Sequence, residues 1–203
     1  MLLLLINKSS DKTLSDKSIK MKAEKMDYRV EIPEKVSVDL KDGLFAVKGP
    51  KGEVKRKFIF PKIKIVKEGN AILFSTVKPT KREKAAIFTT EAHLRNMFKG
   101  VLESSLYKLK ICSGHFPMKV TLKANILEVK NYMGETVPRT LKIKPGVDVQ
   151  VKEPEISVTS PDRELAAQTA AAIEQIARRA NFDRRIFQDG IYITMKDGKE
   201  LTK

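Results

Sequence analysis

Cysteine, histidine and tryptophan are nearly absent from this chain of 203 residues. It has one cysteine, two histidines and no tryptophan, and aromatic residues make up 6% of it. A single cysteine, Cys112, excludes a disulfide within the chain and is typical of a reducing compartment. Together with His93 and His115 it offers too few ligands for a convincing zinc site. The shortage of aromatic residues argues against a broad surface on which bases stack.

Motifs for catalysis and nucleotide binding are also missing. The sequence has no histidine-centred pair of nucleophile and base. The stretch Gly49–Gly52 lacks the spacing of a phosphate-binding loop, and acidic residues are scattered rather than clustered. We therefore expect no enzyme, no cofactor, no metal and no small-molecule substrate. A metal-dependent nuclease is the least favoured alternative.

Long hydrophobic runs are lacking too. Residues 2–6 form a run of five apolar residues, which is too short for a membrane span or the core of a signal peptide. Residues 7–25 are rich in Ser, Lys and Asp, so residues 1–25 are predicted to be a disordered lead. Met21 and Met26 are both plausible alternative starts. We expect a cytoplasmic protein without a membrane partner.

Positive charge is what the chain has in excess. Forty Lys and Arg face 25 Asp and Glu, which gives a formal charge of +15 and an isoelectric point near 9.8. Such a charge attracts polyanions, and nucleic acid is the natural one; an anionic membrane surface is the weaker alternative. A protein-only adaptor would leave this charge unexplained. The few aromatic residues indicate that phosphate contacts dominate the binding.

The second half of the sequence repeats the first at a constant spacing of 82 residues. Gly52-Glu53 aligns with Gly134-Glu135, and Pro79-Thr80 aligns with Pro161-Asp162. The alternating residues Val36, Val38 and Leu40 align with Met118, Val120 and Leu122. Agreement across turn, strand and helix signals indicates one supersecondary unit used twice.

Each unit reads as short strands followed by one helix. Strands are predicted in the first unit at residues 28–32, 36–40, 44–48, 53–60, 63–66 and 72–77, and in the second at 107–111, 119–122, 126–130, 137–143, 147–151 and 156–159. Thr80 with Glu83 forms a capping box before a helix whose apolar stripe is Ile87, Thr90, Leu94, Met97 and Val101.

The second unit repeats this plan and then extends it. Asp162 takes the capping position, and Leu165, Thr169, Ile173 and Ile176 are predicted as the buried face of the second helix. The fold class is therefore α+β: two tandem copies of a small antiparallel sheet with one helix packed on one face. We place the first repeat at residues 26–104 and the second, with a basic C-terminal extension, at 105–203.

Two stretches of the second unit resemble a known family. Residues 114–117 (Gly-His-Phe-Pro) and 185–193 (Arg-Ile-Phe-Gln-Asp-Gly-Ile-Tyr-Ile), together with the doubled unit, resemble the universal large-subunit ribosomal protein six family in its archaeal and eukaryotic branch. The resemblance covers residues 26 to the C-terminus. It implies a structural constituent of the large ribosomal subunit that supports translation. It also implies binding to large-subunit rRNA near the base of the factor-binding stalk, beside neighbouring ribosomal proteins.

The predicted RNA contacts lie in the second unit. Arg178, Arg179, Arg184 and Arg185 cluster where the second helix is expected to end, and guanidinium groups suit phosphate oxygens. The alternative is a solvated helix end whose cations favour the helix dipole.

Three further residues complete the predicted site. Tyr192 could stack on a nucleotide, although such residues more often pack a sheet. Gly190 follows Asp189 in an expected turn with positive φ. His115 lies either on a phosphate or in a turn between the two units.

Deletion of residues 1–25 should leave the thermal unfolding transition unchanged, because this segment has too little apolar content to pack on a domain. Calorimetry of the full chain and of the truncated chain tests this. A large drop in the transition temperature would show that residues 2–6 pack on the folded part.

Overall fold

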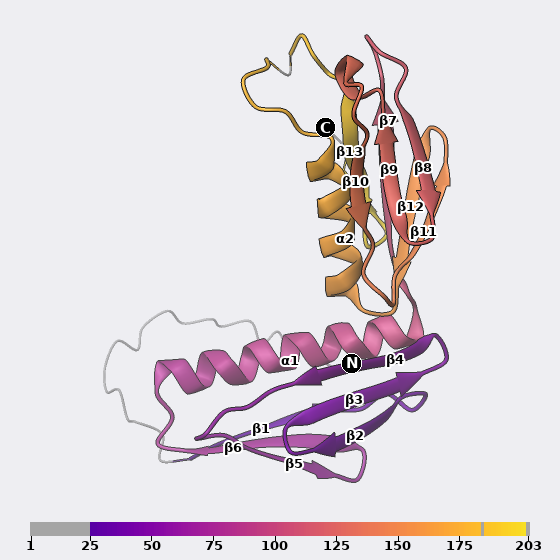
Figure 1. The fold of residues 1–203 in the computed structure, drawn as a ribbon. Coiled ribbons are helices and arrows are strands. Elements are labelled where there is room, and N and C mark those ends of the chain that lie inside the picture. Colours follow the sequence, from indigo (N-terminus) through magenta and orange to yellow (C-terminus); the bar gives the residue numbers. More distant parts are fainter. Residues whose placement is uncertain (1–24, 184, 202–203) are drawn as a thin grey trace, which may run out of the picture.

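The computed structural model describes residues 25–183 and 185–201. They form two units that follow one another along the chain, and each combines antiparallel strands with one α-helix (Figure 1). The predicted fold class, α+β with two copies of one plan, is confirmed. In Figure 1 the second unit stands on the C-terminal half of the first unit's helix.

The first unit begins at residue 25 and ends with its helix. Its elements are β1 (Lys25–Glu31), β2 (Ser37–Lys41), β3 (Leu44–Gly49), β4 (Gly52–Lys57), β5 (Lys64–Glu68), β6 (Ala71–Val77) and α1 (Lys81–Leu102).

The second unit repeats this order and adds two strands. Its elements are β7 (Ser105–Cys112), β8 (Lys119–Lys123), β9 (Ile126–Lys130), the 3-10 turn η1 (Tyr132–Gly134), β10 (Arg139–Lys142), β11 (Asp148–Lys152), β12 (Glu155–Ser160), α2 (Arg163–Ile176), β13 (Gly190–Lys196) and β14 (Lys199–Glu200).

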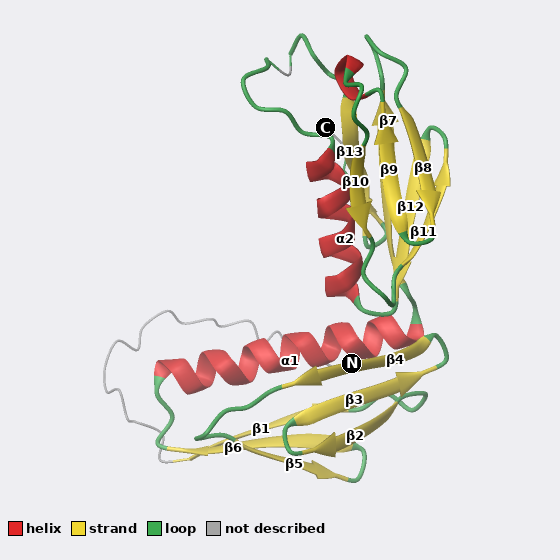
Figure 2. Ribbon diagram, viewed as in Figure 1, coloured by secondary structure: helices red, strands yellow, loops and turns green. Residues whose placement is uncertain are grey.

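The strands of each unit divide into two sheets. The first unit has two three-stranded sheets, ordered β1-β6-β5 and β2-β3-β4. The second has the three-stranded sheet β10-β9-β8 and the five-stranded sheet β11-β12-β7-β13-β14 (Figure 2). All pairings are antiparallel. The C-terminal extension thus enlarges one sheet of the second unit, because β13 pairs with β7.

Helix α1 begins and packs as its sequence predicts. The Thr80 side chain accepts a hydrogen bond from the backbone N–H of Arg82, and the Glu83 carboxylate accepts one from the backbone N–H of Thr80 at 2.9 Å. All five residues of the predicted stripe are buried: Ile87, Thr90, Leu94, Met97 and Val101. Their burial holds α1 against a core that the sheets supply through residues such as Phe45 and Val47.

The buried face of α2 differs from the predicted one. Thr169 and Ile173 are buried as expected, but Leu165 and Ile176 are only half-buried. Ala166 and Ala170 are buried, and the core is shared with residues of the sheets such as Leu127 and Val129. Small alanine side chains let the helix lie close to the sheet, so the buried stripe turns toward them.

The alignment of Gly52 with Gly134 was wrong. Gly52 pairs directly with Gly49 across a two-residue turn, whereas Gly134 lies in η1. Val129 lies 82 residues after Val47, but its partner Arg139 lies 85 residues after Val54, the partner of Val47. The second unit therefore has a connection three residues longer between these strands, and the spacing of 82 returns at the helix caps Thr80 and Asp162.

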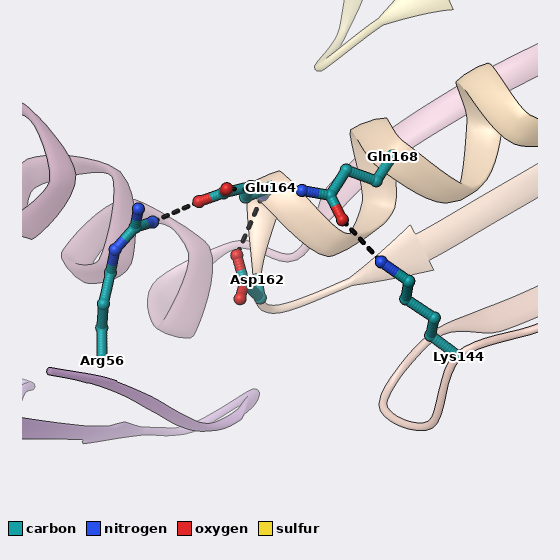
Figure 3. A network of polar contacts seen from close by, with 5 residues as sticks. All are labelled: Arg56, Lys144, Asp162, Glu164 and Gln168. Atoms are coloured by element: carbon teal, nitrogen blue, oxygen red, sulfur yellow. Dashed lines mark hydrogen bonds and ion pairs between the residues drawn. The ribbon is translucent and has the colours of Figure 1, made fainter.

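Polar contacts join the two units at the beginning of α2. Arg56 of β4 forms an ion pair with Glu164, whose backbone N–H donates to Asp162 at 2.9 Å (Figure 3). Gln168 connects this network to Lys144, whose amine lies 2.8 Å from the Gln168 side-chain oxygen.

A second set of contacts lies on α1. Arg163 donates to the Asn96 side-chain oxygen at 2.9 Å and pairs with Asp197 at 3.4 Å. Lys99 pairs with the same Asp197 carboxylate at 3.2 Å. Burial raises the pKa of Asp197, but the hydrogen bonds and charges around it, those of Lys99 first, outweigh burial and lower it. The carboxylate therefore stays ionised between two cations from the two units.

Gly100 brings the backbones of the two units together. It is buried in α1, and a Cβ built on it would lie 2.0 Å from the carbonyl oxygen of Pro161. No L-residue with a side chain fits here unless the backbone moves.

Replacing Gly100 with Ala should therefore lower the free energy of unfolding by about 1–3 kcal/mol, the usual cost of overpacking. An ordinary Gly→Ala change inside a helix has the opposite sign, because alanine is the better helix former. Urea unfolding of the two proteins measures the difference. Unchanged or increased stability of Gly100→Ala would show that the units can separate at this point without cost.

Candidate RNA interface

The predicted cations lie around the end of α2. Arg178 and Arg179 follow its last residue, and Arg185 lies in the connection to β13; all three are exposed. The ion pairs found in the described part of the chain involve none of them. Arg184 lies outside the described residues. Three of the four predicted arginines thus present unpaired charge near one end of the second unit.

Asp189 fixes the connection that carries these arginines. The residue is 5% exposed, and its carboxylate accepts hydrogen bonds from the backbone N–H of Gly114 and, at 3.2 Å, of His115. Burial raises the pKa of the Asp189 carboxyl, but the N–H donors of Gly114, His115 and Phe116 and the charge of His115 outweigh it. The pKa accordingly lies below its ordinary value. The Asp189-Gly190 pair predicts only a turn, and the anchoring role of Asp189 is not apparent in the sequence.

His115 lies in the loop between β7 and β8, within the second unit and not between the units. Its Nδ1 atom is 3.4 Å from the Asp189 carboxylate, and its ring lies 5.3 Å from that of Phe187. Phe187 in turn contacts Phe182 edge to face, and the Arg179 guanidinium lies over the Phe182 ring at 4.5 Å. These contacts make one row from His115 to Arg179. Phe187 is half-buried in this row.

Gly190 is the first residue of β13 and does not have the predicted positive φ. A Cβ at this position would lie 3.2 Å from the Tyr192 ring and 3.3 Å from the carbonyl oxygen of Ala177. The glycine is thus suited to close packing between β13 and the end of α2. Tyr192 is half-buried beside it, which is the packed alternative of the two considered for this residue.

Arg139 stabilises the end of α2 from the neighbouring sheet. Its guanidinium donates to the carbonyl oxygens of Ile176 at 2.7 Å and Arg178 at 3.0 Å, and lies over the Tyr132 ring at 4.4 Å. Glu135 binds the same guanidinium at 2.7 Å, and this hydrogen bond lowers the pKa of its carboxyl. The role of Arg139 is not apparent in the sequence, because the carbonyl groups that it binds lie 37 and 39 residues further along the chain.

The cavity at this surface is small. A cleft of about 70 Å³ is lined by residues including Tyr132, Phe182 and Tyr192. Pockets for small molecules usually measure about 300–1,000 Å³, so the surface suits contact with a chain rather than enclosure of a ligand. Among residues 25–183 and 185–201, no three His, Cys, Asp or Glu side chains are arranged to hold a metal ion. No described helix combines the length and the apolar character needed to cross a membrane.

The hairpin of β3 and β4 in the first unit carries Lys55 and Arg56, whose side chains contact other residues of the protein. Arg56 pairs with Glu164 and lies 5.5 Å from the centre of the Phe58 ring, and Lys55 lies 3.3 Å from Glu53. Arg56 thus helps to hold the two units together.

A duplicated α+β protein with unpaired arginines on a preorganised loop has the features of an RNA-associated structural protein. Comparison with known proteins identifies the family. The family model described as "Ribosomal protein L6" matches residues 32–104 and 116–190. The "Large ribosomal subunit protein uL6" of Methanococcus vannielii is 43% identical over 172 residues, which covers 85% of this chain and 94% of the relative.

Two other archaeal relatives of the same name agree. The protein of Saccharolobus solfataricus is 43% identical over 169 residues (83% of this chain, 93% of the relative). That of Nanoarchaeum equitans is 42% identical over 182 residues (86% and 95%). The chain therefore belongs to the ribosomal protein L6 family. It is a structural protein of the large ribosomal subunit in the cytoplasm and not an enzyme, and the resemblance of its motifs to this family is confirmed.

Replacing Asp189 with Asn should cost about 1–3 kcal/mol of unfolding free energy at pH 7, because buried N–H donors lose a charged acceptor. Since the folded-state pKa of Asp189 is lowered, its contribution is present above the ordinary carboxyl pKa of about 3.9 and is lost as the pH falls through the lower folded value. The stability difference between the two proteins should thus shrink below about pH 4.

Urea unfolding of both proteins at pH 7 and at pH 3 checks this. The exposed Asp148 provides the control, because its carboxylate accepts a hydrogen bond from the Gln150 side chain at the surface. Asp148→Asn should change stability by less than about 0.5 kcal/mol at either pH. An equal loss from Asp189→Asn at both pH values would contradict the anchoring role.

Proposed function

We propose that this protein binds large-subunit rRNA through its second unit, near the base of the factor-binding stalk and beside neighbouring ribosomal proteins. The observation that carries the proposal is the group of exposed, unpaired arginines at the end of α2. The rRNA-binding residues would be Arg178, Arg179, Arg184, Arg185, Gly190, Tyr192 and His115.

The charge of these arginines favours a polyanion. Arg178, Arg179 and Arg185 belong to a chain with a formal charge of +15, and no described acidic side chain neutralises them by an ion pair. An exposed guanidinium can bind two oxygens of one phosphate with parallel hydrogen bonds. The two carbonyl groups at the helix end that would compete for such donors are already occupied by Arg139.

Described residues on both sides of Arg184 in the connection between α2 and β13 are held by contacts within the protein. Asp189 fixes one end, and the Asp183 side chain accepts a hydrogen bond from the backbone N–H of Arg185 at 2.9 Å. The edge-to-face contact between the rings of Phe182 and Phe187 adds a further constraint. An interface that is already ordered loses less conformational entropy when it binds.

The remaining residues would contribute through shape and ring chemistry. Gly190 is buried and would contribute indirectly, because its small size lets β13 pack against the end of α2, and the exposed edge of His115 could donate to a phosphate oxygen. Tyr192 would contribute its polar tip. The location near the stalk base rests on the family resemblance of the motifs at residues 114–117 and 185–193.

Replacing Arg184 and Arg185 together with Ala should weaken binding to a large-subunit rRNA fragment without unfolding the protein, since surface changes usually alter stability by about 0.5 kcal/mol or less. The affinity of the unmodified chain should fall steeply with salt. The slope of log affinity against log salt should become shallower by up to about 2 in the variant, because each lost phosphate contact removes about 0.7–0.9. Fluorescence titration at several salt concentrations measures both quantities.

The matched control removes the same charge from the first unit. Lys51 and Lys57 are exposed and form no ion pair with a described residue, unlike Arg56, so their replacement by Ala leaves the contacts between the units intact. Equal losses from the two double variants on the same fragment would indicate a diffuse charge effect. An affinity independent of salt would exclude phosphate contact as the basis of binding.

A further inference from the structure

The internal duplication reveals an unpaired strand edge in the first unit. In the second unit, β7 has a partner on each side, β12 on one and β13 on the other. Its counterpart β1 pairs with β6 alone among the described strands. The first unit lacks an equivalent of β13, and one edge of its sheet has no strand on it in the described part of the chain.

The two strands can be matched residue by residue. Ile32 donates its backbone N–H to Asn70 at 3.0 Å, and Ile111 donates to Pro154 at 2.8 Å, at the same turn of each unit. Ile32 and Ile111 are therefore equivalent. Because β13 pairs Tyr192 with Lys110, the place corresponding to Tyr192 lies beside Glu31.

Hydrogen-bonding groups of β1 point toward this open edge. Backbone groups alternate in direction along a strand. Since the N–H of Ile32 points to β6, those of Arg29 and Glu31 point away from it. Equivalent groups in β7, at Lys108 and Lys110, face β13. The open edge thus offers the same ladder that β13 uses in the second unit.

A groove lies where β13 would continue. It has a volume of about 430 Å³ and is lined by Glu31, Pro33, Arg95, Phe98, Lys99, Leu102 and Glu103. Gly190 at the beginning of β13 contacts Ala177, which lies 82 residues after Arg95 of this groove. The groove therefore corresponds to the space that the beginning of β13 fills. Phe98 and Leu102 give it an apolar wall.

The unbalanced charge of this groove is negative. Arg95 pairs with Glu91, and Lys99 pairs with Asp197 at 3.2 Å. Glu31 and Glu103 are exposed and belong to none of the ion pairs within residues 25–183 and 185–201. Arg29, also exposed on β1, is not part of the groove lining. Two free carboxylates repel RNA phosphates and attract a basic chain.

We propose that the outer edge of β1, with the groove between β1 and α1, is a strand-addition site for an extended basic segment of a neighbouring protein in the large subunit. The segment would run antiparallel to β1, as β13 runs to β7. It would place apolar side chains against Phe98 and Leu102 and a Lys or Arg beside Glu31 and Glu103. Backbone ladders give such complexes their affinity, and side-chain pockets give them their specificity.

Site-specific cross-linking within assembled subunits tests this proposal. The full chain carries p-benzoylphenylalanine in place of Arg29, and large subunits containing it are irradiated and digested. Mass spectrometry should identify a link to an extended, Lys- or Arg-containing segment of another subunit protein. The product should survive RNase. The same cross-linker at Val66, on the exposed edge strand β5, should not give this product.

Charge reversal provides the second readout. Glu31→Lys in the cross-linking chain should lower the yield of this product roughly fivefold, because an attraction becomes a repulsion at the surface. Glu68→Lys, on the exposed β5, should leave the yield unchanged. Thermal unfolding of both variants confirms that they fold. A link to rRNA, to residues 1–24 of the same chain or to a second copy would overturn the proposal, as would no link or an equal yield from the two variants.

Discussion

A single buried carboxylate, that of Asp189, organises the candidate RNA interface of the second unit. Asp189 joins the end of one long connection to the loop at Gly114 and His115, although 74 or 75 residues separate these partners in the chain. Its ionised form is favoured by the backbone N–H donors of that loop. With this contact in place, the ring of His115 lies against that of Phe187, which in turn contacts Phe182 beneath Arg179.

The parts of the fold that depend on local sequence could be predicted. The Thr80 capping box and the stripe through Leu94 and Val101 follow from side-chain chemistry within one or two helical turns. By contrast, the burial of Ala166 in place of Leu165 depends on how closely the sheet approaches α2. The distance between the sheet and α2 cannot be read from the periodicity of the helix sequence.

The candidate site was predictable by residue type and less so by geometry. The arginines after α2 could be found because charge is visible in sequence. The roles of Asp189 and Arg139 could not, since both act on partners far away in the chain: Asp189 on Gly114, and Arg139 on Ile176. Gly190 was predicted as a turn from its neighbour in sequence, whereas its small size serves contact with the end of a helix.

The contact between Gly100 and Pro161 fixes the angle between the two units. Each unit has its own hydrophobic core, and the junction leaves no room for a single methyl group. A protein whose two units bind two different components of a particle then sets the orientation of these components relative to each other. Once one unit is bound, the other is already positioned and oriented for its own target, which favours assembly in a single arrangement.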